Sequence, residues 1–217
     1  MVLDPEVWGI AGFSFRVSLS AAAIAALLAI PAGLLLAGRE FSGKAQVVTA
    51  LNTLLSVPTV VIGLFVYLLI RGNGVLGPLH LLFTPPAIVI GQVILALPII
   101  TALTYAAVAG VDPRVRATAL TLGAGRVQAD LTVLAEARAG ILAGVAAGFG
   151  RVISEVGSVI MLGGNIRGFT RTITTAIAME TDKGEFARSI VLAVILLTVA
   201  LVINALVHRA LMARRRV

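Results

Sequence analysis

The amino-acid sequence predicts an all-α integral membrane protein with five transmembrane helices, forming a single domain over residues 1–217. The first observation is composition, because 59% of the residues are hydrophobic and only 12% are charged. A soluble domain carries roughly 25% charged residues. The second observation is the mean hydropathy of +1.06. The third is the pattern, in which five long apolar runs alternate with short charged or glycine- and proline-rich segments.

The five apolar runs are long enough to cross a bilayer. The first has no charged residue over 22 positions, and about 20 apolar residues cross a hydrocarbon core of about 30 Å. Pro31, Pro58 and Pro98 lie near the middle of three runs. They predict either kinked helices around a pathway or ordinary prolines that neighbouring helices tolerate. The predicted spans are residues 17–38, 45–70, 87–111, 139–162 and 189–207.

Composition also argues against several function classes. The chain has no cysteine, so it has no disulfide, thiol catalyst or cysteine-based metal site. His80 and His208 lie far apart in sequence, so we expect no histidine-based metal site. The net charge of +7 is better explained by basic cytoplasmic loops than by a nucleic-acid partner. Asp4 and Glu6 make the N-terminus acidic, unlike the start of a signal peptide.

The distribution of basic residues predicts the orientation. Five spans place the two termini on opposite sides, and basic residues favour the cytoplasmic side. One side carries ten of them and the other carries five, or six if Arg16 is counted. We therefore expect the N-terminus outside and the basic tail inside. The ten are Arg39, Lys44, Arg114, Arg116, Arg126, Arg138, Arg209, Arg214, Arg215 and Arg216.

The longest charged interval, residues 112–138, predicts two short helices around a corner. Asp112 and Pro113 are typical of a helix start, with Asp as N-cap and Pro at the first helical position. Gly123 and Gly125 permit a sharp break. Apolar residues spaced four and three apart then predict a second short helix: Val127, Leu131 and Leu134. Such a pair can lie on a membrane surface and offer a knob to a partner.

That interval resembles the cytoplasmic coupling loop of ABC-importer permeases. The family pattern is Glu-Ala-Ala, three residues, Gly, nine residues, then Ile-x-Leu-Pro. Ala119 and Gly123 match, while Ala117 replaces the leading Glu and Ala135-Glu136 replaces Leu-Pro. The resemblance implies contact with a cytoplasmic ATPase, whereas the alternative is an ordinary charged loop. The implied coupling residues are Ala117, Ala119, Leu122, Gly123, Ala124 and Arg126.

Two further patterns precede the C-terminal third. Residues 38–45 nearly match a phosphate-binding loop, but Ala45 stands where a hydroxyl is needed and the segment joins two predicted membrane helices. We expect no nucleotide site there. Gly140, Gly144 and Gly148 recur every four residues, which predicts close helix packing within the subunit or at a dimer seam.

Arg151 and Glu155 are four residues apart, with Ser154 beside them, in the predicted fourth span. The spacing puts the two charges on one face of a helix, and counting from Ala139 puts them near the middle of the bilayer. Charges at that depth tend to face protein or water. We interpret the three residues as part of a pathway or gate, and the alternative is an ion pair that only neutralises itself.

Residues 150–186 resemble the permeases of tungstate importers, which are close relatives of molybdate permeases. The resemblance rests on Ser154-Glu155-Val156-Gly157, Gly164-Asn165-Ile166, Gly168, Thr170-Arg171-Thr172, Thr174-Thr175-Ala176-Ile177 and Glu180-Thr181. The polar outer loop 163–188 could donate hydrogen bonds to an oxyanion or to a docked protein. Its threonines could equally satisfy backbone carbonyls. The candidates are Asn165, Thr170, Arg171 and Thr172.

The resemblance implies a permease subunit of an ABC-type tungstate importer in a prokaryotic plasma membrane. Its expected partners are a second copy of itself, a cytoplasmic ATPase dimer that uses ATP and magnesium, and an extracytoplasmic oxyanion-binding protein. No catalytic residue, cofactor or metal is expected in this chain. Three alternatives remain, namely molybdate or another oxyanion as substrate, a channel or secondary transporter that works without ATP, and a membrane enzyme. Against the enzyme, no nucleophile–base pair or metal cluster is evident.

Overall fold

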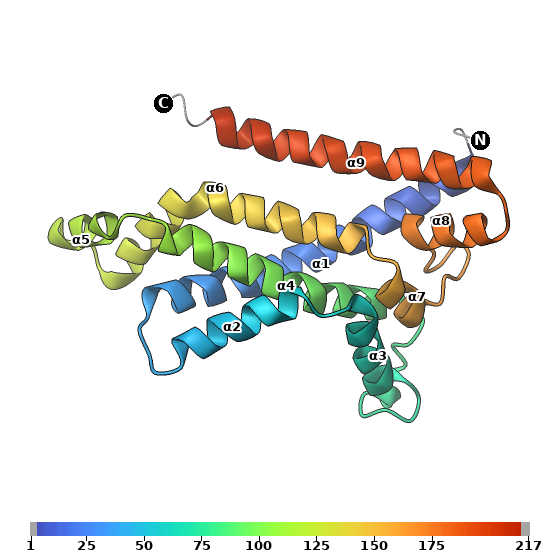
Figure 1. Ribbon diagram of the computed structural model, residues 1–217, viewed down its shortest axis with the longest axis horizontal. Coiled ribbons are helices and arrows are strands. Elements are labelled where there is room, and N and C mark those ends of the chain that lie inside the picture. Colours follow the sequence, from blue (N-terminus) through green and yellow to red (C-terminus); the bar gives the residue numbers. More distant parts are fainter. Residues whose placement is uncertain (1–3, 214–217) are drawn as a thin grey trace.

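The computed structural model describes residues 4–213, and the regular secondary structure in that range is all helix (Figure 1). Arg214, Arg215 and Arg216 of the basic tail lie outside the described residues. The elements in order are α1 Pro5–Gly38, α2 Lys44–Leu55, α3 Thr59–Ile70, the short 3-10 helix η1 Gly77–Leu79, α4 Pro85–Ala109, α5 Pro113–Thr121, α6 Arg126–Ile153, α7 Gly157–Gly163, α8 Ile173–Asp182 and α9 Phe186–Ala213.

Four helices are each long and apolar enough to cross a membrane, namely α1, α4, α6 and α9. The pair α2 and α3 would make a fifth crossing if its two bent halves count as one span. The all-α fold class is confirmed. Helix α1 starts twelve residues before the predicted span, because Asp4 accepts from the backbone N–H of Glu6 and caps the helix start.

Helices α1, α4 and α6 form the packed centre of the molecule, and small residues let their backbones approach closely. A Cβ added at Gly33 of α1 would lie 2.7 Å from Thr104 Cβ of α4. Between α4 and α6, Cβ atoms added at Gly144 and Gly148 would lie 2.9 Å from Leu103 Cβ and 2.6 Å from Ile100 Cγ1. Side chains larger than hydrogen do not fit at these contacts. The predicted glycine stripe therefore packs within the subunit.

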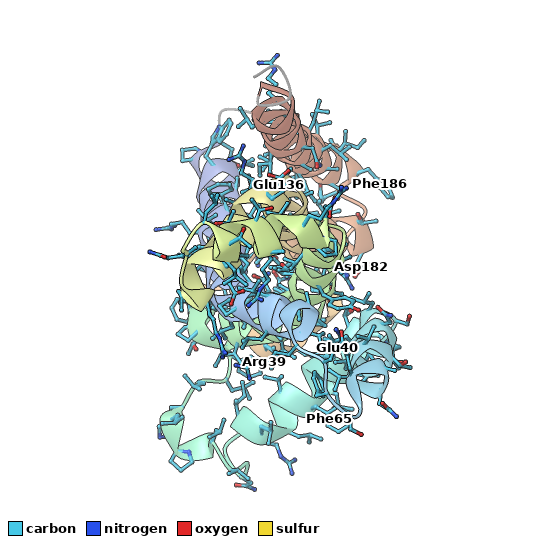
Figure 2. All side chains as sticks on the ribbon, turned by 90° about the vertical axis from the view of Figure 1, so that its left-hand side faces the viewer. Arg39, Glu40, Phe65, Glu136, Asp182 and Phe186 are labelled. Atoms are coloured by element: carbon cyan, nitrogen blue, oxygen red, sulfur yellow. The ribbon has the colours of Figure 1, made fainter. Side chains whose placement is uncertain are left out.

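The predicted span 45–70 is not one continuous helix. Helix α2 ends at Leu55, and α3 begins at Thr59 at an angle of 97° to it. Pro58 lies at the break with an extended ψ of 128°, which a helix interior does not allow, and it has no N–H to donate. Helix α3 consequently leaves the bundle sideways (Figure 1). Viewed down the long axis, α3 with Phe65 and helix α9 lie on opposite sides (Figure 2).

The expected division between a loop at 112–138 and a span at 139–162 is also wrong. Helix α6 starts at Arg126 and runs unbroken to Ile153, so the second short helix is only its first turns. The chain then breaks at residues 154–156, and the short helix α7 follows. Ser154 supports the break, because its hydroxyl donates to the backbone oxygens of Gly150 at 2.9 Å and Arg151 at 3.0 Å.

The two ends of the molecule carry different elements. Helix α5 and the end of α9 lie at one end of the long axis, while α7, α8 and the start of α1 lie at the other (Figure 1). Helix α9 begins three residues before the predicted span, at Phe186, and continues beyond it. It is anchored near its start by Leu192, which packs with Val7, Ile173 and Ala176. Its outer face is otherwise largely exposed.

Candidate functional site

The first candidate region is the glycine corner, residues 117–126, together with the start of α5. The Asp112 carboxylate accepts from the backbone N–H of Arg114 at 2.9 Å, and Pro113 is the first helical residue. Both features are as predicted. The side chain of Arg114 also pairs with this carboxylate at 2.7 Å, and its hydrogen bond lowers the pKa of Asp112. The start of α5 is therefore fixed by local bonds alone.

The end of α5 is closed by a left-handed glycine. Gly123 has a φ of +89°, which costs a residue with a Cβ roughly 1–2 kcal/mol. Its N–H donates to Leu120 O at 3.1 Å, and the N–H of Ala124 donates to Ala119 O at 3.0 Å. These two bonds are the Schellman pattern of a helix C-terminus. The chain then turns sharply, and Gly125 caps α6 with its N–H bonded to Gln128 Oε1.

The corner is held firmly against the body of the protein. Arg116 of α5 donates to Asp130 of α6 at 2.9 Å. Val115 packs against the apolar cluster that includes Val133 and Ala137. Leu122 lies just beyond the last residue of α5 and is 82% exposed. The corner thus presents its apolar side chains outwards while its base is fixed.

The sequence-predicted residues of this region do lie together at one tip of the molecule (Figure 1). Ala117, Leu122, Gly123 and Arg126 are exposed, while Ala119 and Ala124 are half-buried. A groove of about 580 Å³ runs beside α5, lined by Arg114, Thr118, Leu122 and Thr132, among others. Exposed apolar side chains continue along the same tip, at Leu120, Val127 and Leu131. Sequence reasoning did not include Leu120 or Thr132 among the candidates.

The second candidate region is the ion pair of Arg151 and Glu155. Arg151 Nη1 donates to Glu155 Oε2 at 2.8 Å, and the Glu155 side chain is 3% exposed against 40% for Arg151. Glu155 Oε1 also accepts from the backbone N–H of Ser158 at 3.1 Å. The two charges therefore do not share one helix. Arg151 sits in the last turn of α6 and Glu155 caps the start of α7, where the two helix dipoles favour those signs.

The pair lies beyond the middle of α4, towards the end of the bundle that carries α7 and α8. Gln92 of α4 donates to the backbone oxygen of Val152 at 3.0 Å, so it marks the same level. Gln92 is 17 residues before Ala109, the end of α4, or about 26 Å at 1.5 Å per residue. Gln92 is also five residues, or about 8 Å, from the middle of the 25-residue helix α4, on the side of Pro85. Helix α6 starts at Arg126 rather than Ala139, so a count from Ala139 does not measure the depth of the pair.

The threonines of the outer loop bond to their own chain. Thr170 donates to the backbone oxygen of Gly163. Thr172 caps α8, and its N–H donates to Thr175 Oγ1 at 3.0 Å. Thr175 in turn donates to Asn165 Oδ1 at 2.9 Å. These buried hydroxyls favour the interpretation in which the threonines satisfy chain acceptors rather than an oxyanion.

Sequence reasoning missed a cluster of charges centred on Glu6, at the end of the bundle that carries α7 and α8. Arg167 bonds both carboxylate oxygens of Glu6 at 2.7 Å, and Arg188 bonds one of them at 2.7 Å. Arg171, mostly buried, lies 3.8 Å away. The cluster ties the start of α1 to the outer loop and to α9. The partners are 161 and 182 residues apart in sequence, so no local pattern could have indicated them.

Comparison with known proteins places the chain in a family. The family model described as the inner membrane component of binding-protein-dependent transport systems matches residues 29–216. A probable anion ABC transporter permease protein of Haloferax volcanii is 42% identical over 202 residues, which is 91% of this chain and 87% of that protein. The tungstate uptake system permease protein TupB of Peptoclostridium acidaminophilum is 38% identical over 205 residues, covering 94% and 90%. TupB of Campylobacter jejuni is 41% identical over 170 residues, covering 78% and 71%.

The fold and these matches define a multi-pass membrane permease. The chain belongs to the family of inner membrane components of binding-protein-dependent transport systems. It is a permease subunit of the ABC transporter type, a class of subunit that is not itself catalytic.

Proposed function

We propose that this chain is the permease of an ATP-driven tungstate importer. Two relatives at 38% and 41% identity carry the name of tungstate uptake permeases, and they support tungstate as the substrate here. The same resemblance lies in residues 150–186 of the sequence. The runner-up substrate is molybdate, which is also a tetrahedral dianion.

The observation that carries the proposal is the glycine corner. It is a rigid, mostly exposed tip with apolar side chains such as Leu122, which is 82% exposed. Its base is fixed by the Arg116–Asp130 pair and by Val115. A tip that is exposed, apolar and rigid suits insertion into a cleft of a partner protein. In this proposal the partner is a cytoplasmic ATPase, which holds ATP and magnesium and drives transport by pushing on the corner.

The remaining partners follow from the importer class. A second copy of the chain completes the transport pathway, and an extracytoplasmic protein delivers the oxyanion to the end that carries α7 and α8. The ten basic residues on one side support an arrangement with the corner and the C-terminus in the cytoplasm. The start of α1 is then outside. Arg151 and Glu155 stand on the route of the anion near its outer entrance, where releasing Arg151 would present a positive charge.

The test is uptake by the purified permease and its ATPase in sealed liposomes, with the oxyanion-binding protein added outside. Tungstate uptake that depends on ATP inside the liposomes is expected, with molybdate competing more weakly. Stronger uptake of molybdate than of tungstate would identify molybdate as the substrate. Uptake without ATP would replace the importer by a channel or secondary transporter.

A further inference from the structure

Helix α2 has an unusual surface for a membrane helix, because none of its residues is buried in the chain. Its side towards α4 is only half-covered, at Lys44, Val48 and Leu51. Polar residues gather on another side and are all exposed. At 100° per residue they and the residue that caps the helix fall within an arc of about 120°. They are Gln46, Thr49, Asn52, Thr53 and Ser56, and we call them the α2 polar stripe.

The polar stripe has no side-chain hydrogen bond to another element among the described residues. Over residues 4–213 its one side-chain hydrogen bond is from Thr53 to the backbone oxygen of Thr49, within α2 itself. The remaining exposed side of α2 is apolar and includes Val47 and Leu54, which are 43% and 48% exposed. Helix α2 is thus amphipathic on its uncovered surface. Helix α9, which is also exposed, presents mainly large apolar side chains, such as Leu197 at 69% and Leu201 at 70%.

Depth makes this polarity significant. Lys44 lies over the ring of Tyr105 near the end of α4, 5.9 Å from its centroid, so α2 starts at the end of the bundle that carries the corner. Its 12 residues rise about 18 Å, which is past the middle of a 30 Å core. Leaving one amide such as that of Asn52 unpaired in an apolar medium costs roughly 2–7 kcal/mol. Lipid cannot be the normal neighbour of the stripe.

The end of the stripe at Ser56 lies near the ion pair of Arg151 and Glu155. Ser56 stands at the break before α3, and Val60 follows in the first turn of that helix. A Cβ added at Gly157 would lie 2.8 Å from Val60 Cγ2 and 3.7 Å from Glu155 Oε1. The breaks at 56–58 and 154–156 are therefore neighbours. Glu155, which pairs with Arg151, therefore lies near the break at the Ser56 end of the stripe.

We infer that the α2 polar stripe is one wall of a water-filled anion pathway, whose opposite wall is the same stripe of a second copy. One chain does not cover the stripe, whereas two copies related by a twofold axis bring identical stripes face to face. Amides and hydroxyls donate to the oxygens of a tetrahedral oxyanion and carry no negative charge to repel it. This inference rests on the proposed function and assigns residues to its pathway.

The experiment uses the permease–ATPase complex in liposomes. Because the natural chain has no cysteine, each single-cysteine variant of it needs no other substitution. Thr49→Cys and Thr53→Cys test the stripe, while Val47→Cys and Leu54→Cys are the matched exposed controls. The probe is an anionic methanethiosulfonate, followed by intact-mass spectrometry. Reaction at 49 and 53 should be faster than at 47 and 54 on the order of tenfold, because only a hydrated thiol ionises to the reactive thiolate.

Equal reaction at all four positions, or no reaction at 49 and 53, would overturn the inference. A bismaleimide should join two copies through Thr53→Cys and not through Leu54→Cys, and the reverse result would also overturn it. These readouts do not depend on the substrate. The expected labelling with no tungstate uptake by the natural chain would reject the proposed substrate alone. Tungstate uptake with equal labelling at all four positions would reject the inference about the α2 polar stripe and leave the proposed function in place.

Discussion

Glu155 links two helices through one carboxylate, accepting from Arg151 and from the N–H of Ser158. Glu155→Gln keeps an oxygen for Ser158 but removes the charge that faces Arg151. Breaking a buried pair typically costs about 3–5 kcal/mol, and the 40% exposure of Arg151 should place this change below that range. Glu155→Ala also removes the cap and should lower the thermal unfolding midpoint further. Differential scanning fluorimetry of the purified complex measures both shifts.

The double variant Arg151→Met with Glu155→Gln separates a structural role of the pair from a role in transport. If the pair only neutralises itself, assembly and tungstate uptake should both recover. If it belongs to a gate, assembly should recover while uptake per ATP hydrolysed stays low. We expect the second result, because Arg151 is partly exposed although its partner is buried. Normal uptake by Glu155→Gln alone would contradict both roles.

Gly123 is the residue on which the shape of the corner depends. A Cβ there would meet no neighbour within 4 Å, so the φ of +89° is the only obstacle to a larger residue. Gly123→Val should strain the corner and lower ATPase association or substrate-stimulated hydrolysis, with the chain still in the membrane. Gly123→Asn is the matched control, because Asn adopts the left-handed region more readily. Equal coupling in the natural chain and the Val variant would mean that the corner does not transmit force.

At the scale of the element, the contact of α6 with α4 makes a sharp prediction. Gly144→Leu would push a side chain into Leu103, whereas a Cβ at Gly150 of the same helix meets nothing within 4 Å. Overpacking typically costs about 1–3 kcal/mol. The Gly144 variant should therefore show a lower unfolding midpoint and less monodisperse protein on size exclusion, and Gly150→Leu should behave like the natural chain. A tolerated Gly144→Leu would argue against this helix pairing.

The elements that sequence predicts well are those fixed by neighbours in the chain. Asp112 and Gly123 bound α5 through bonds that reach only a few residues, so their residue types suffice. Pro58 predicts a kink at the first break, and Arg151 and Glu155 put two charges beside the second. Neither pattern fixes the 97° angle at the first break or the end of α6 at Ile153. The packing of Gly63 against Ser158, with an added Cβ 2.9 Å from Ser158 Cα, joins distant segments. Sequence periodicity cannot predict that contact, nor the ion pair of Glu6 with Arg167.

At the scale of the whole molecule, the orientation in the membrane can be tested. Leu122 follows α5, and Phe169 lies between α7 and α8; they are 82% and 50% exposed. Helix α5 and the pair α7 and α8 lie at opposite ends of the molecule (Figure 1). With Phe169→Cys, an impermeant thiol reagent should label intact cells. With Leu122→Cys, labelling should require permeabilised cells, because positive charge is concentrated at that end. The opposite pattern would reverse the orientation and remove the corner from the reach of a cytoplasmic ATPase.

Helix α6 is continuous from Arg126, at the corner, to Ile153, two residues before Glu155. Its 28 residues form a rod of about 42 Å, with no loop between its ends to absorb a displacement. The glycine contacts with α4 leave it little room to slide sideways. A force applied at the corner would therefore shift or tilt helix α6 as one rigid body. The ion pair at the other end of α6 would then move together with the corner, without a chain of side-chain rearrangements between them.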